Sequence, residues 1–276
     1  MASLKNKLIA LKNIHKEQYD IEVQYCNELI EVEKKYMNLL KPYWKKRAEI
    51  VSGKYDDSKE IQEEDNDNEY PEFNCLNNIH CKGIPDFWLT VMLHHPKISE
   101  NITELDIKIL SFLKDIRVEY MKENANFRLA FDFMQRSQKD EEIENIYFNN
   151  ETLYLNFYYV LDNSYGKAEY SHSHVEGTEI SWKNINYVEE AVKNKSSSFF
   201  MIFYPPHPDD HDNELESNII NETLNQIFEI GEIIKDVLIP QAVDWYTGKA
   251  LLYSYNEDTE DGSWVGADIN DLKIEE

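Results

Sequence analysis

The sequence has little of what most enzyme sites are built from. Its 276 residues include only eight glycines, and none of these belongs to a glycine-rich loop of the kind that cradles phosphate groups. The G-x-S-x-G and H-E-x-x-H patterns of hydrolase and metalloprotease sites are also missing. Acidic residues are so common that paired carboxylates arise by chance, and they therefore indicate no acid–base pair. We expect a protein that is not an enzyme and needs no cofactor.

Cysteines and long apolar runs are equally scarce. The three cysteines are an odd number, which suits a reducing compartment. The longest apolar run, at residues 199–204, is too short to span a bilayer. The N-terminus lacks the apolar segment of a signal peptide. These features predict a soluble intracellular protein without a membrane partner.

Positive charge is scarce as well. The chain has 53 acidic and 28 basic residues, and its net charge is −25. Residues 1–53 carry ten basic and seven acidic residues, so the remaining 18 basic and 46 acidic residues contain the whole excess. We expect no direct binding to nucleic acid, whose phosphates repel such a surface. The acidity instead favours a basic partner, because a concentrated field speeds association; solubility alone is the other explanation.

The N-terminal segment is the most regular part of the chain. Residues 4–53 contain no proline before Pro42, and their apolar residues recur in steps of three and four, as on one face of a helix. A helix of this length spans about 70 Å, so the stripe is too long to be buried within its own chain. We predict that it pairs with a second copy, and that Pro42 kinks the helix near its end. The stripe contains Leu4, Leu8, Leu11, Ile21, Tyr25, Leu29, Val32, Tyr36, Leu39 and Tyr43.

Composition divides the chain into four parts. Residues 1–53 form the long helix. Residues 54–80 and 256–276 are acidic and poor in apolar residues, which predicts a flexible linker and a largely disordered tail. Residues 81–255 have the composition of a globular domain.

Helix signals open this domain. Pro85 is typical of the first turn of a helix, whose buried face would include Phe87, Trp88 and Val91. Thr103 and Asp106 resemble a capping box. We predict that the helix after this box continues to about Lys114 and buries Ile107, Leu110 and Leu113.

Apolar and polar residues then alternate with the period of two that indicates half-buried strands. The segments 127–133, 152–160 and 168–175 predict an antiparallel sheet, and 178–182 and 199–204 are further strand candidates. A long amphipathic helix should follow through Leu215 and Ile219, kinked at Pro240 and ending near Gly248. The predicted fold class is α+β: a long N-terminal helix plus a mainly antiparallel sheet packed against helices.

Histidines supply the weak metal signals. His172 and His174 stand two apart on a predicted strand and should point to one face, whereas His207 and His211 flank an acidic loop. Each pair is half of a metal site at most, because neither has a full ligand set at familiar spacing. We predict that no metal is bound; an unrecognised metal-dependent enzyme is the competing interpretation.

Three blocks of sequence, in order, cover nearly the whole chain. They are Lys35–Arg47 with Ile50–Gly53, then Gly83–Thr90 with Leu113–Ile116, and then Ser198–Phe200 with Tyr204–Pro206, Phe228–Ile234, Ile239–Pro240 and Tyr246–Gly248. Together these blocks resemble the nucleosome assembly protein family of histone chaperones. The resemblance implies an antiparallel homodimer through the long helix, an earmuff-like α+β domain and no catalytic activity.

The same resemblance implies that an acidic concave surface of the homodimer binds core histones and promotes nucleosome assembly or histone transport. An acidic scaffold or phosphatase inhibitor of the same superfamily is the alternative. The expected dimer contacts are Leu11, Ile14, Ile21, Tyr25, Leu29, Val32, Tyr36 and Leu39. The candidate histone contacts are Glu176, Glu179, Asp209, Asp210, Asp212 and Glu214.

The chain differs from many members of this family in one segment that bears on its localisation. Many family members carry a basic hairpin, used for nuclear import, just before the Ser198–Phe200 block. Here Lys193 and Lys195 are balanced by Glu189 and Glu190. We expect a cytoplasmic protein that can shuttle to the nucleus, but the reduced basic hairpin argues against import through this hairpin alone.

Overall fold

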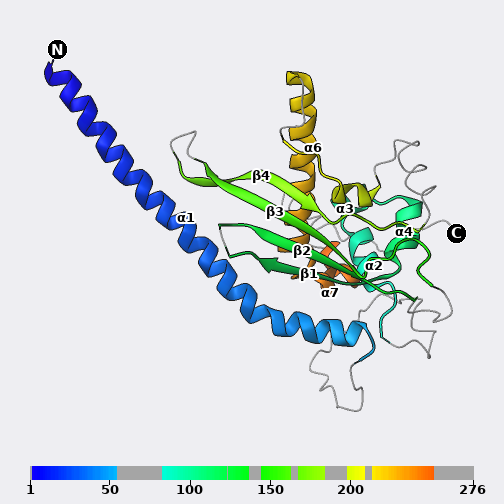
Figure 1. The fold of residues 1–276 in the computed structure, drawn as a ribbon. Coiled ribbons are helices and arrows are strands. Elements are labelled where there is room, and N and C mark those ends of the chain that lie inside the picture. The colour runs from blue at the N-terminus through cyan, green and yellow to red at the C-terminus, as the bar shows by residue number, and fades with distance from the viewer. Residues whose placement is uncertain are drawn as a thin grey trace, which may run out of the picture.

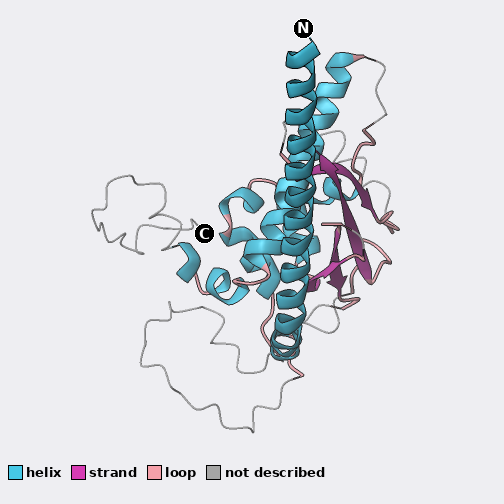
Figure 2. Cartoon of the chain, turned by 90° about the vertical axis from the view of Figure 1, so that its left-hand side faces the viewer, coloured by secondary structure: helices cyan, strands magenta, loops and turns pink. Residues whose placement is uncertain are grey.

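The protein consists of a long helix lying beside an α+β body (Figure 1). The structure is a computed structural model, and it describes residues 2–54, 83–122, 124–136, 144–162, 167–183, 198–208 and 213–251. The body has a four-stranded antiparallel sheet, and Figure 2 shows the strands gathered on one side of the chain and most helical segments of the body on the other. The predicted fold class is confirmed.

Helix α1 (Ala2–Val51) matches the predicted N-terminal helix closely. Pro42 lies inside it, where proline removes one backbone hydrogen bond and crowds the preceding turn. Figure 1 shows the helix changing direction in its C-terminal third, which contains Pro42. Pro42 therefore lies inside the helix without ending it, as predicted, and the bend occurs in the same third of the helix.

A second apolar stripe on α1 was not recognised in the sequence. It lies about 120° around the helix from the first, given 3.6 residues per turn. Ile30, Met37 and Trp44 of this stripe pack against the core of the body, and Val51 is part of that core. The helix thus packs against its own sheet along one face while the first stripe remains exposed. The second stripe consists of Tyr19, Val23, Cys26, Ile30, Met37, Trp44, Ala48 and Val51.

The sheet has the order β1-β2-β3-β4, and each strand is antiparallel to its neighbours. Strands β2 and β3 lie in the centre and supply most of the sheet's buried residues. Phe127 and Phe157 stack across them with ring centroids 4.6 Å apart. The strands are β1 (Leu113–Tyr120), β2 (Phe127–Phe133), β3 (Thr152–Asp162) and β4 (Glu169–Gly177).

Three short helices precede the sheet in the chain. They are α2 (Phe87–His94), α3 (Pro96–Ser99) and α4 (Glu104–Leu110). The capping box of α4 is present, with Asp106 replacing the usual Glu or Gln. The buried Asp106 carboxylate also accepts hydrogen bonds from the Ser198 hydroxyl at 2.6 Å and from the Phe199 backbone at 3.0 Å. One carboxylate therefore joins the start of α4 to a segment more than ninety residues later.

The C-terminal part begins with that segment. A 3₁₀ helix, η2 (Phe199–Phe203), is followed by α6 (Glu214–Ile233), the π-helical turn η3 (Ile234–Leu238) and α7 (Ala242–Tyr246). The predicted long helix is therefore divided around Pro240, and Gly248, at φ +75°, follows its last part. Figure 1 shows the N-terminal end of α6 projecting beyond the sheet.

Several predicted elements are wrong in their extent. Helix α4 stops at Leu110, and Leu113 opens β1, which was not predicted at all. Ile107 is exposed, and Ile109 is buried in its place. Helix α2 begins at Phe87, after Pro85, because Asp86 has a left-handed backbone at φ 56°.

Two strand candidates are also wrong. In the candidate 199–204, residues Phe199–Phe203 form η2, because a short apolar run is equally compatible with a buried helical turn. In 178–182 only Trp182 pairs, through an isolated bridge to Phe148.

The predicted apolar face of the long C-terminal helix is exposed at Leu215 and Ile219, since the first turns of α6 extend past the sheet. The predicted linker lies almost entirely outside the described residues, and the predicted tail lies wholly outside them.

The close approach of α6 to β3 depends on Gly231. A Cβ atom at this position would lie 2.3 Å from Cζ of Phe157, a ring in the centre of the core. We predict that Gly231→Ala lowers the free energy of unfolding by about 1–3 kcal/mol through overpacking. Denaturant unfolding should measure it, with the exposed Asn221→Ala of the same helix as control. Equal stability of the two variants would contradict the packing described.

Candidate functional site

The exposed stripe of α1 is a long apolar row on the surface of the described chain. The eight predicted dimer residues are between 43% and 69% exposed: Leu11, Ile14, Ile21, Tyr25, Leu29, Val32, Tyr36 and Leu39. Leu4, Leu8 and Tyr43 extend the same row. A monomer seldom exposes a contiguous apolar row of this length, and such rows mark interaction sites. The structure places all eight residues on one face, away from the sheet.

Polar contacts on the other side of α1 fix its orientation to the sheet. Tyr170 donates a hydrogen bond to Oδ1 of Asn27 at 2.7 Å, and Tyr120 donates to Glu33 at 2.6 Å. The backbone N–H of Ala168 donates to Glu22 at 3.1 Å. These bonds join α1 to both edge strands or their flanks, so the exposed stripe is held facing outward.

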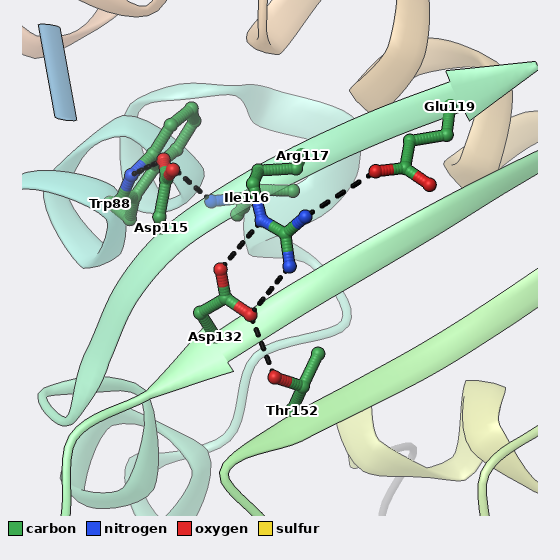
Figure 3. Close-up of polar contacts among 7 residues, drawn as sticks. All are labelled: Trp88, Asp115, Ile116, Arg117, Glu119, Asp132 and Thr152. Atoms are coloured by element: carbon green, nitrogen blue, oxygen red, sulfur yellow. Dashed lines mark hydrogen bonds and ion pairs between the residues drawn. The ribbon is translucent and has the colours of Figure 1, made fainter. Parts of the chain in front are cut away.

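The C-terminal end of α1 is anchored by Arg47. Its guanidinium donates to the carbonyl of Ile239 at 2.5 Å and lies 5.0 Å from the ring centroid of Trp88. Trp88 in turn donates through Nε1 to Oδ1 of Asp115 at 3.1 Å, which Figure 3 shows beside the Ile116 backbone. One side chain of α1 thus contacts α2 and the segment between η3 and α7, and it acts electrostatically on β1.

Burial shapes the charge of this anchor. Desolvation raises the pKa of Asp115 to about 6, and the nearby Arg47 guanidinium opposes that rise. Desolvation likewise lowers the pKa of Arg47, while Asp115 counteracts it. Each group therefore stabilises the charged form of the other in a partly buried site.

A polar row crosses strands β1 to β3 and was not anticipated, because β1 was not predicted. Arg117 forms a two-pronged ion pair with Asp132, at 2.7 and 2.9 Å, and Thr152 donates to the same carboxylate at 2.8 Å (Figure 3). The hydrogen bond to Asp132 raises the pKa of Arg117. The row fixes the register of three strands. Its one cation, Arg117, is already paired with Asp132.

The candidate histone-binding carboxylates are only partly described. Glu176 lies on β4 and accepts a hydrogen bond from the Tyr158 hydroxyl at 2.8 Å, which raises the pKa of Tyr158. Glu179 is exposed just beyond β4, and Glu214 is the exposed first residue of α6. These three belong to separate elements. Asp209, Asp210 and Asp212 lie outside the described residues.

Most of the acidic excess also lies outside the described residues. Of the 46 acidic and 18 basic residues after residue 53, 26 acidic and 6 basic ones belong to the segments that are not described. This leaves 20 acidic and 12 basic residues in the described body, a net charge of −8 against −20 for the remainder. The negative charge is therefore concentrated in the segments outside the described residues.

The predicted histidine pair is separated by a β-bulge. His172 pairs with Tyr159 and His174 with Tyr158, so Ser173 is the extra residue and the two imidazoles point to opposite faces. The prediction that they share a face is wrong. His174 and His207 have ring centroids 6.4 Å apart, and His211 is not described. Within the described ranges, no three His, Cys, Asp or Glu side chains are arranged to hold a metal ion.

Comparison with known proteins gives a consistent result. The model of the family described as Nucleosome assembly protein (NAP) matches residues 6–249. A Saccharomyces cerevisiae nucleosome assembly protein is 32% identical over an alignment of 283 positions, gaps included, that covers 90% of this chain and 66% of that protein. A putative nucleosome assembly protein of Schizosaccharomyces pombe is 29% identical, over 99% of this chain and 74% of its own. The chain thus spans just under two thirds of the first relative.

Solved structures agree with these matches. A malaria parasite nucleosome assembly protein is similar with a TM-score of 0.57 and 26% identity, covering 90% of this chain and 98% of its own. Nucleosome Assembly Protein 1 from Plasmodium knowlesi has a TM-score of 0.56 and 25% identity, with the same coverage. In the part of the chain described here, none of the helices is long and apolar enough to cross a membrane.

Replacing Arg47 tests the anchor. We predict that Arg47→Met lowers the free energy of unfolding by about 3 kcal/mol near neutral pH, because it leaves a partly buried carboxylate without its counter-charge. The pKa of Asp115 is raised in the folded state, so its ionisation opposes folding and stability falls as the pH rises from about 4 through about 6. Without the guanidinium that pKa rises further, so the loss should be larger near neutral pH than near pH 5.

Denaturant unfolding at the two pH values measures this difference. The double variant Arg47→Met/Asp115→Asn is the control, because a neutral pair removes the pH dependence of the loss. A loss in Arg47→Met that is the same at both pH values would show that the two groups are not coupled.

Proposed function

Because the chain belongs to the nucleosome assembly protein family, we propose that it is a non-enzymatic histone chaperone that acts as a homodimer. The observation that carries this proposal is the family match over residues 6–249, which takes in both α1 and the body. The partners are core histones, whose basic surfaces complement a chain with a net charge of −25. We propose no direct contact with nucleic acid, because phosphates carry the same sign of charge.

The proposed mechanism is electrostatic shielding. Carboxylates of the chaperone neutralise histone lysines and arginines that would otherwise bind DNA non-specifically. Release of the histones onto DNA then favours nucleosome assembly. Much of the acidic excess lies in the segments between and after the folded elements. We infer that the folded body positions the histone while these segments supply much of the charge, since numerous carboxylates raise the association rate.

The exposed stripe of α1 supports the dimer. Burial of a side chain as large as Tyr25, Leu29 or Tyr36 would stabilise the dimer by about 1.5–3 kcal/mol for each residue. A single chain leaves these side chains in water and does not gain this free energy. An antiparallel copy of α1 places Tyr25 and Leu29 near the symmetry axis, so that the same residues meet from both sides. The dimer then presents two bodies on one platform, which makes histone binding multivalent.

Charged substitutions at the axis test the dimer. We predict that Tyr25→Glu and Leu29→Glu convert the dimer to monomers or aggregates, because each places two carboxylates in an apolar interface. Size-exclusion chromatography with light scattering at micromolar concentration measures the mass. Asn38→Glu, at an exposed position on a different face of α1, is the matched control and should remain dimeric. A wild-type monomer under these conditions would overturn the proposal.

Histone binding is tested with charge-matched triple variants. We predict that the wild type retains core histones at about 0.15 M salt, and that Glu176→Gln/Glu179→Gln/Glu214→Gln weakens binding about tenfold through the loss of three ion pairs of up to about 1 kcal/mol each. Asp209→Asn/Asp210→Asn/Asp212→Asn should have a similar effect.

Glu100→Gln/Glu104→Gln/Glu144→Gln is the control, since it removes the same charge from exposed sites elsewhere on the body. Equal losses in all three variants would mean that charge alone, and not these positions, determines affinity. A wild-type protein that does not retain histones would contradict the chaperone itself. Tight binding to a phosphatase would then favour the alternative of an acidic phosphatase inhibitor.

A further inference from the structure

His172 lies where β4 meets α6, with a hydrogen-bond acceptor at each ring nitrogen. Nδ1 is 3.3 Å from Oδ1 of Asn225, and Nε2 is 3.3 Å from Oε1 of Glu232. A neutral imidazole carries one N–H and can donate to only one of these oxygens. The imidazolium donates to both. The two acceptors lie about two turns apart on the same helix. This arrangement therefore suits the charged ring.

The flat face of the ring has an equally specific neighbour. His172 stacks on Phe228 of α6 with ring centroids 4.0 Å apart and planes inclined by 3°. A cation over an aromatic face is stabilised by the negative charge of that face. Two acceptors at the ring edge and one π-face below it all favour the protonated form. All three partners belong to α6, whereas His172 belongs to β4.

Other groups around this site keep their charge when His172 titrates. The Tyr159 hydroxyl donates to the same Glu232 oxygen at 2.7 Å, and burial raises the pKa of both Tyr159 and Tyr120. Both phenols are therefore neutral in the physiological range. On η3, Lys235 and Asp236 pair with each other at 2.5 Å. Among these groups, the imidazole is the one whose charge changes between about pH 5 and 8.

We propose that His172 is held as an imidazolium and clamps β4 to α6, so that this strand–helix contact weakens as the pH rises. The β-bulge at Ser173 makes the clamp available, because it turns His172 toward α6 and leaves His174 stacked on Tyr158 on the opposite face. His174 is thus a natural reference in the same strand.

The sign of the pH dependence follows from both partners. The hydrogen bond to Glu232 raises the pKa of His172 against the opposing effect of desolvation, and the hydrogen bond from His172 lowers the pKa of Glu232. The contribution of His172 is complete below its unfolded pKa of about 6.5 and is lost as the pH rises through its folded pKa. The contribution of Glu232 is present above about 4.3 and is lost as the pH falls through its own lowered pKa. The clamp is strongest between these limits.

Nitrogen NMR of the full-length protein with labelled histidine tests the protonation state. The resonance missing from His172→Gln identifies the ring. We expect it to carry protons on both nitrogens at neutral pH and to titrate above the ordinary histidine pKa, and in Glu232→Gln we expect that pKa to fall to the ordinary value or lower. A ring with one proton at neutral pH, or a pKa unchanged in Glu232→Gln, would overturn the proposal. A purely structural histidine would not respond to Glu232→Gln.

Hydrogen exchange tests the clamp itself. After correction for the intrinsic pH dependence of exchange, protection of residues 169–177 should fall about threefold from about pH 6 to pH 8 in the wild type, a modest change because both side chains are partly exposed. His174→Gln is the matched control and should behave like the wild type, whereas His172→Gln should have, at both pH values, the lower protection that the wild type has at pH 8. Wild-type protection that does not change with pH would refute the clamp, and Glu232→Gln provides the same test if His172→Gln does not fold.

Discussion

The rest of the structure depends on the contact between the second apolar stripe of α1 and the sheet. Ile30, Met37 and Trp44 pack along the body, and Arg47 fixes the end of the helix at α2, β1 and the carbonyl of Ile239. This contact determines which face of the helix remains exposed. The apolar stripe that the sequence reveals most clearly is therefore exposed because the second stripe packs against the sheet. In the proposed dimer, packing within one chain therefore sets the direction from which the second chain approaches.

Much of the fold could be predicted from local patterns, because those patterns have local causes. The α1 stripe, the capping box at Thr103 and the alternation of β2 each depend on residues within a few positions of one another. Strand β1 escaped prediction because a register irregularity between Leu113 and Asp115 interrupts its period of two. The run Phe199–Phe203 was misassigned because an apolar segment of that length has no distinguishing period.

The candidate site could be predicted less well, since it depends on contacts between distant parts of the chain. The net charge indicated a basic partner, but the described carboxylates Glu176, Glu179 and Glu214 belong to different elements. Whether His172 and His174 share a face depended on one extra residue in a strand pair, which no composition or spacing rule reports. Arg47 and Asp115 are 68 positions apart, and only the folded structure shows that each changes the charge state of the other.

The two stripes on α1 also constrain how such a chain can change its length. They are related by a fixed angular phase, and adding one residue within the helix rotates everything beyond it by about 100°. A single insertion between Tyr19 and Val51 would thus turn part of the exposed face toward the sheet and part of the packed face toward solvent. An insertion of seven residues shifts the phase by only about 20° and preserves both faces. Lineages of this chain should therefore gain or lose helix in whole heptads, which in the proposed dimer would change the spacing of the two bodies and leave their mutual orientation nearly constant.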